Sequence, residues 1–161
     1  MIDLAAILPQ LVLAFSGALF GALLGGAVSW TRARRERRLK LTLDLYAEFG
    51  APEFNRIRLI AHDALTGAPD LPTAYAQASG EAREAIYSIV HFWEKAALLT
   101  RADAVDGSLM ARFFGQYARW WRDLLCRAPA EDDPEWGQTV QDMDWLFRRL
   151  TRKDQRKGSR R

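Results

Sequence analysis

Glu94 is the acidic residue whose surroundings most suggest a special role, because it interrupts an apolar run from Ile89 to Leu99. If this run is a buried helix, the carboxylate needs a partner, since a lone charge in an apolar setting is costly. Arg58 is the candidate partner in a structural ion pair. The alternative hypothesis places Glu94 on a solvent-facing side of the helix, beside Lys95. Neither arrangement makes Glu94 a catalytic residue.

Other groups that bind metals or act as nucleophiles are sparse. His62 and His91 stand 29 residues apart, and neither has a Cys, Asp or Glu at the spacing of a known metal site. His62 and Asp63 are adjacent, so they point in different directions on a helix. Cys126 is the single cysteine, and no redox or nucleophile motif surrounds it. The sequence therefore predicts no catalytic residue, no metal site and no cofactor.

Trp120 and Trp121 are adjacent, and a helix that buries one of them turns the other by about 100° around its axis. Burial of large aromatic residues in the core is the ordinary outcome. Aromatic residues outside a core are also enriched where proteins contact each other. Burial is therefore the favoured interpretation for Trp120 and Trp121, and a contact for a partner outside the core is the alternative.

The first element of the chain is an uncharged segment of 28 residues from Leu4 to Thr31. A helix needs about 20 apolar residues to cross a hydrocarbon core of roughly 30 Å. Residues 1–31 are therefore predicted to form an N-terminal transmembrane anchor.

Two alternatives to a membrane span exist for this segment. A signal peptide has a basic leader, whereas here Asp3 precedes the apolar residues, although Ala27 and Ser29 imitate a cleavage site. A buried helix of a soluble domain is usually shorter and apolar on one side only. The span explains the length and the composition of the segment better.

A basic juxtamembrane segment, residues 32–40, follows directly. Short flanks rich in Lys and Arg stay on the cytoplasmic side and attract anionic lipid. We therefore expect a single-pass protein of the inner (cytoplasmic) membrane with its C-terminal domain in the cytosol. The residues predicted to lie at the membrane surface are Arg32, Arg34, Arg35, Arg37, Arg38 and Lys40.

Within the span, Gly17, Gly21 and Gly25 recur every four residues. Small residues at this spacing let two membrane helices approach closely. The pattern predicts a homo-oligomer, or pairing with a different span, through this strip. The alternative is that it reflects only the usual composition of membrane helices.

Residues 41–150 show a helical period throughout, which predicts an all-α cytosolic domain of about four or five helices that continues from the membrane helix. Helix starts are expected at Pro52, at Ser79 and at Asp103 or Asp106. Residues 68–80 are expected to form a loop with one helical turn. Residues 151–161 are predicted to be a basic disordered tail. No aromatic residue alternates with its basic residues, so nucleic acid is not the expected partner.

Four short motifs follow the N-terminal span in a fixed order. They are Pro52–Glu53–Phe54 with Arg58, Phe92–Trp93–Glu94 with Leu98–Leu99, Phe113–Phe114–Gly115 and Trp120–Trp121. This order of motifs resembles a bacterial family called domain of unknown function 4760. The resemblance covers roughly Leu41 to Phe147 and implies a small helical cytoplasmic domain on a membrane anchor, with no assigned activity.

Two functions are compatible with these features. The first is a membrane-anchored interaction or scaffold module that presents a helical surface to a protein partner, with the lipid bilayer as its other contact. The alternative is a membrane-tethered enzyme or effector with an unrecognised active site. An exposed aromatic patch favours the interaction module, whereas a cluster of polar groups in a concave pocket favours the enzyme.

Overall fold

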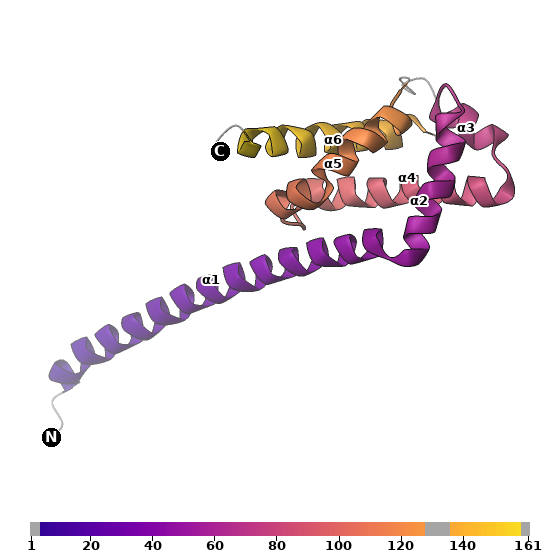
Figure 1. Cartoon of the computed structure of the whole chain (residues 1–161). Helices are drawn as coiled ribbons and strands as arrows, with labels where there is room; N and C mark the ends of the chain where they lie inside the picture. Colours follow the sequence, from indigo (N-terminus) through magenta and orange to yellow (C-terminus); the bar gives the residue numbers. More distant parts are fainter. Residues whose placement is uncertain (1–3, 128–135, 159–161) are drawn as a thin grey trace. The chain divides into compact units, whose positions relative to one another are not determined.

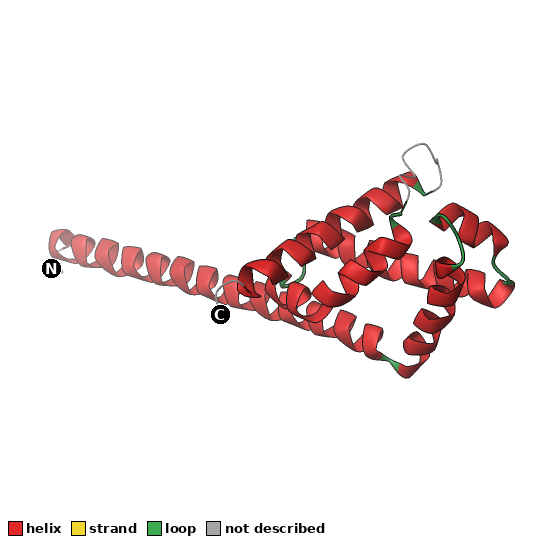
Figure 2. Ribbon diagram, turned by 45° about the horizontal axis from the view of Figure 1, so that its top comes forward, coloured by secondary structure: helices red, strands yellow, loops and turns green. Residues whose placement is uncertain are grey.

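The computed structural model describes residues 4–127 and 136–158, with side chains described from residue 25 to residue 152 outside that gap. The described residues form helices and connecting loops without any strand, which confirms the all-α prediction (Figure 2). The chain divides into two units, Met1–Arg37 and Arg38–Arg161.

Helix α1 (Leu4–Gly50) is 47 residues long and contributes to both units. The continuous helix from the predicted anchor to Gly50 agrees with the sequence pattern. Most of the predicted span lies outside the described side chains, which begin at Gly25. In the part of the chain that is described, no helix is both long enough and apolar enough to cross a membrane.

Three helices of the second unit begin at the predicted residues. Helix α2 (Pro52–Thr66) has Pro52 at its first position, where the missing N–H costs nothing. Helix α4 (Gly80–Arg101) is capped by Ser79, whose hydroxyl oxygen accepts from the backbone N–H of Ala82 at 3.4 Å. Helix α5 (Gly107–Leu125) is capped by the carboxylate of Asp106. Local capping chemistry therefore sets these boundaries.

Two segments differ from the prediction. Helix α3 (Leu71–Gln77) occupies the expected loop, because the Asp70 carboxylate accepts from the backbone N–H of Thr73 at 2.8 Å and caps a seven-residue helix. Hydrogen bonding from Thr73 lowers the pKa of Asp70. Helix α6 (Gly137–Gly158) continues through the predicted disordered tail, so that prediction is wrong for residues 151–158. Residues 159–161 lie outside the described part.

Helix α4 lies at the centre of the second unit, where it packs against α2 and α6, while α5 packs mainly against α6 (Figure 1). The core is strongly aromatic. Trp93 of α4 is fully buried and meets the ring of Phe147 edge to face, at 4.9 Å between centroids. Phe49, near the end of α1, contacts Trp93 and Phe114 in the same way. These ring contacts join α1, α4, α5 and α6 in one core.

Candidate functional site

The Glu94 carboxylate lies on α4 and is directed toward α6. Its Oε1 accepts a hydrogen bond of 2.8 Å from the hydroxyl of Thr139. Its Oε2 lies 3.8 Å from Nδ1 of His91, one turn earlier on α4. The side chain is one-third exposed, so Glu94 is neither fully buried nor fully solvent-facing.

The structure does not bring Glu94 and Arg58 together, and the predicted ion pair is wrong. Arg58 of α2 instead places its guanidinium carbon 4.2 Å from the ring centroid of Phe49 and 5.6 Å from that of Tyr117. Its Nε is buried and has no hydrogen-bond partner among the described residues. Glu94 and Arg58 thus belong to two different clusters, because α4 directs Glu94 toward α6 while Arg58 packs against aromatic rings of α1 and α5.

A pocket of about 150 Å³ surrounds Glu94. Three helices supply its walls, and four of the lining side chains carry rings. Tyr87 and His91 are parallel, with an interplanar angle of 2° and centroids 6.0 Å apart. Tyr75 and Trp136 meet edge to face at 5.1 Å. The lining residues are Tyr75 from α3, Tyr87, Val90, His91 and Glu94 from α4, and Trp136 and Thr139 at the start of α6.

His62 lies apart from this pocket. Its ring packs against that of Trp120 at 4.7 Å, and its two ring nitrogens lie 3.4 Å from Asp63 and from Thr66. Within the described residues, no three His, Cys, Asp or Glu side chains gather in a way that could hold a metal ion.

Cys126 follows α5 and is partly buried. Burial raises the pKa of the Cys126 thiol to about 12, and the nearby Asp144 carboxylate adds to the effect, while Arg122 and Arg148 oppose it. Only the thiolate is a strong nucleophile. The thiol is therefore protonated and unreactive at neutral pH.

The tryptophan pair divides between core and surface. Trp121 is fully buried, whereas Trp120 is 43% exposed. Phe113, Tyr117 and Trp120 follow one another along α5 at spacings of four and three residues, so they share one side of that helix.

Neighbouring helices extend this exposed side of α5. Tyr46 of α1 stacks on Phe113 with centroids 4.4 Å apart. On α2, Leu59 lies one turn before His62, whose ring contacts Trp120. Leu59 is 67% exposed, the largest exposed fraction among the large apolar residues described in the bundle. We call this surface, formed by Tyr46, Leu59, Phe113, Tyr117 and Trp120, the aromatic face.

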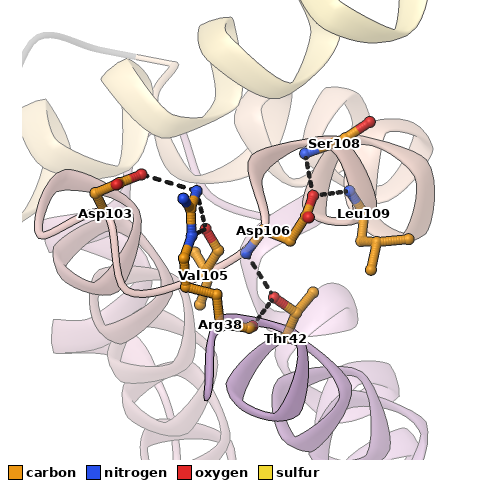
Figure 3. Close-up of polar contacts among 7 residues, drawn as sticks. All are labelled: Arg38, Thr42, Asp103, Val105, Asp106, Ser108 and Leu109. Atoms are coloured by element: carbon orange, nitrogen blue, oxygen red, sulfur yellow. Dashed lines mark hydrogen bonds and ion pairs between the residues drawn. The ribbon is translucent and has the colours of Figure 1, made fainter. Parts of the chain in front are cut away.

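Of the six predicted membrane-surface cations, Arg38 has a different role. It belongs to the bundle, where its Nε and Nη2 donate to the carbonyl oxygen of Val105 at 3.1 and 3.0 Å (Figure 3). Its Nη2 also pairs with Asp103 at 2.8 Å. The prediction for Arg38 is therefore corrected, because it ties α1 to the turn between α4 and α5.

The other basic residues and the glycine strip are described only in part. In the first unit, Arg32 pairs with Glu36 one turn later, at 3.0 Å, and Arg34 lies 5.6 Å from the ring centroid of Trp30. Gly25 has open space around the position of a Cβ atom. Gly17 and Gly21 precede the described side chains, so packing through the glycine strip stays a prediction.

The buried hydroxyl of Thr42 forms two hydrogen bonds that the sequence pattern did not indicate. It donates to the carbonyl oxygen of Arg38 and accepts from the backbone N–H of Asp106, both at 2.8 Å (Figure 3). A threonine among the inward-facing apolar residues of α1 was the available signal, since a buried hydroxyl needs a partner.

Comparison with family models gives a match over residues 11–125 to the model described as Domain of unknown function (DUF4760). The chain therefore belongs to this family, as its motifs indicated. The match begins inside α1 and ends at the end of α5. Neither the curated proteins nor the solved structures gave a match.

Proposed function

We propose that this DUF4760 protein is a membrane-anchored interaction module whose cytosolic bundle binds a protein partner through the aromatic face. The observation that carries the proposal is the exposure of Leu59 and Trp120 on two helices that pack together, where the ring of Trp120 contacts His62, one turn after Leu59. Aromatic and large aliphatic residues that remain exposed side by side are typical of binding surfaces.

The anchor is inferred from the sequence. Leu4 to Thr31 contains no charged residue and is long enough to cross a bilayer as a helix. Basic residues follow it, while Asp3 precedes it, so the positive-inside rule places the bundle in the cytosol. Anchoring confines the aromatic face to the membrane surface and raises its effective concentration toward partners located there.

The occupant that best fits the aromatic face is an amphipathic helix of an acidic partner protein. The surface is a ridge of rings along α5, next to α1 and α2, and apolar residues at helical spacing on a partner would match it. Arg112 is exposed and directly precedes Phe113 on α5. Acidic side chains beside the apolar stripe of the partner would complement its charge.

Site-specific cross-linking tests this proposal in living cells. A photoreactive phenylalanine analogue is placed at Leu59 or Trp120 of the full chain, and at Leu98 as the control. Leu98 lies on α4 outside the aromatic face, and its exposed fraction of 54% falls between those of Trp120 and Leu59. We expect one protein to be captured at both positions of the face and not at Leu98. Mass spectrometry should map the cross-link to an amphipathic helix with acidic flanks.

A matched pair of variants completes the test. Trp120→Glu should abolish capture at Leu59, because it places a carboxylate among the apolar contacts, whereas Leu98→Glu should leave capture unchanged. Capture of a second copy of this chain, or an equal yield at Leu98, contradicts the proposal.

The orientation is tested separately with reporters fused after Arg161. A fluorescent protein that matures only in the cytosol should be active, and an alkaline phosphatase that folds only in the periplasm should be inactive. An active phosphatase contradicts the cytosolic placement without affecting the argument for the aromatic face.

A further inference from the structure

The pocket around Glu94 lies apart from the aromatic face, and its lining includes none of the residues of that face. It is built from α3, α4 and the first residues of α6. Its α6 wall lies beyond the part of the chain that matches the family model. The pocket is therefore a separate feature with its own chemistry.

Aromatic rings supply most of the walls. Trp136 is nearly buried and its ring contacts Tyr75, while Tyr87 stands exposed on the opposite α4 wall. The faces of Trp and Tyr rings carry negative partial charge, so they attract cations within about 6 Å of the ring centroid. One cation of the protein itself already lies over a ring of the pocket wall: the guanidinium carbon of Arg83 is 5.6 Å from the ring centroid of Tyr75.

Glu94 gives the pocket a fixed negative charge. Thr139 donates to one carboxylate oxygen and so holds the side chain in place. The second oxygen, Oε2, has no hydrogen bond shorter than the 3.8 Å approach of His91 among the described residues, and that distance is too long for a hydrogen bond. This oxygen is therefore available to a ligand.

The volume sets the size of the ligand. A pocket of about 150 Å³ matches the size of cavity that accepts a benzene-sized molecule, on the order of six non-hydrogen atoms. A trimethylammonium or alkylammonium group has this size. Among the lining residues that the structure describes, none is Lys or Arg, and Glu94 is the one carboxylate.

We propose that this pocket binds a small organic cation, an alkylated or quaternary ammonium group, with the rings of Tyr75, Tyr87 and Trp136 around the cation and Glu94 as its counter-ion. Aromatic walls with one carboxylate are the chemistry that recognises such cations, because the rings replace water around a poorly hydrated charge. The same ammonium group occurs in free metabolites and in lipid headgroups, and the test distinguishes these sources.

The experiment uses the full chain in a non-ionic sugar detergent and a phosphate buffer, so that no other amine is present. Choline is titrated against the protein by isothermal calorimetry, and 3,3-dimethylbutan-1-ol, its uncharged carbon isostere, is titrated in parallel. We expect choline to bind with a Kd of about 1 mM or tighter and the isostere at least about tenfold more weakly. Equal binding of the two, or no binding of choline, overturns the proposal.

Variants of α4 locate the site. Glu94→Gln keeps the shape of the side chain and an acceptor for Thr139 while it removes the charge, so choline affinity should fall by about tenfold or more. Glu84→Gln removes the same charge from an exposed position of the same helix and should leave affinity unchanged. An equal loss in both variants would show a non-specific effect of net charge and overturn the proposal.

Tyr87→Leu checks the contribution of the rings. Tyr87 is 56% exposed, so its replacement should not disturb the core, and circular dichroism verifies the fold. Choline affinity should fall several-fold, and an unchanged affinity contradicts a role for this ring. Phosphocholine then separates the two sources, because tighter binding of phosphocholine indicates a lipid headgroup, whereas tighter binding of choline indicates a free ammonium compound.

Discussion

The hydroxyl oxygen of Thr42 accepts a hydrogen bond of 2.8 Å from the backbone N–H of Asp106, although the two residues are 64 positions apart. Asp106 is the cap of α5, where its carboxylate accepts from the backbone N–H groups of Ser108 and Leu109. In a capping box, the cap residue's own N–H is satisfied from within the same helix, by a side chain three residues later. Here a residue of α1 supplies the acceptor, so α1 completes the start of α5 (Figure 3).

Replacing Thr42 by Val should destabilise the bundle by about 1 to 3 kcal/mol, because it leaves the N–H of Asp106 without its acceptor. Thr100→Val is the matched control, since the buried hydroxyl of Thr100 donates only to Ala96 of its own helix. That control should change the unfolding free energy by less than about 0.5 kcal/mol. Urea denaturation measures both, and equal effects would contradict the role given to Thr42.

Glu94 should be coupled energetically to Thr139 and not to Arg58. A double-mutant cycle with Glu94→Ala and Thr139→Val should give a coupling of about 0.5 to 1.5 kcal/mol, because the two side chains share a hydrogen bond. The cycle with Arg58→Met should give a value near zero. A large coupling to Arg58 would restore the ion pair that the sequence suggested.

Arg58 should tolerate replacement by a long apolar residue. Arg58→Met keeps the packing of the stem and removes the buried Nε that has no partner, which offsets the loss of the contact with the Phe49 ring. We expect a change in unfolding free energy within about 1 kcal/mol, whereas Arg58→Ala should destabilise by about 2 kcal/mol through lost packing. Thermal unfolding of both variants measures these changes. A similar loss of stability in both would show that the charge of Arg58 itself stabilises the fold.

Cys126 should resist alkylation in the folded protein. Its pKa is raised from 9.0 to about 12, so iodoacetamide at pH 8 should label it far more slowly than it labels the chain unfolded in urea. Equal labelling rates would show that the thiol is neither buried nor perturbed.

The same shift predicts how stability depends on pH. A thiol whose pKa is higher in the folded state favours folding fully below about pH 9, and this contribution is lost as pH rises toward 12. The difference in unfolding free energy between the wild type and Cys126→Ala should therefore decline over this interval. A constant difference between pH 8 and pH 11 would contradict the shift.

Helix boundaries were predictable where one side chain acts on the backbone next to it. Pro52, Ser79 and Asp106 begin helices for reasons that lie within three residues of each boundary. Asp70 also caps the helix that follows it. Pro69 and Pro72 around it favoured a loop, so only one helical turn was expected where α3 forms. The helical tail after Thr151 was missed because its composition resembles that of disordered segments.

The surroundings of Glu94 were not predictable in the same way. The apolar run around it correctly indicated that Glu94 needs a partner. The identity of that partner depends on which helix packs against α4 beside Glu94, and this helix is α6. Helical period places a residue on a side of its own helix and says nothing about the neighbour. Tyr75 could not be assigned to the pocket, because its segment was expected to be mostly loop.

The contact between Thr42 and Asp106 also has a consequence for the order of events during synthesis. At about 5 to 20 residues per second, the ribosome adds Asp106 roughly 3 to 13 s after Thr42. Phe49, made soon after Thr42, likewise waits for Phe92 and Phe114. The end of α1 is therefore the earliest part of the bundle to be made, and it reaches these native neighbours only after α4 and α5 have been synthesised.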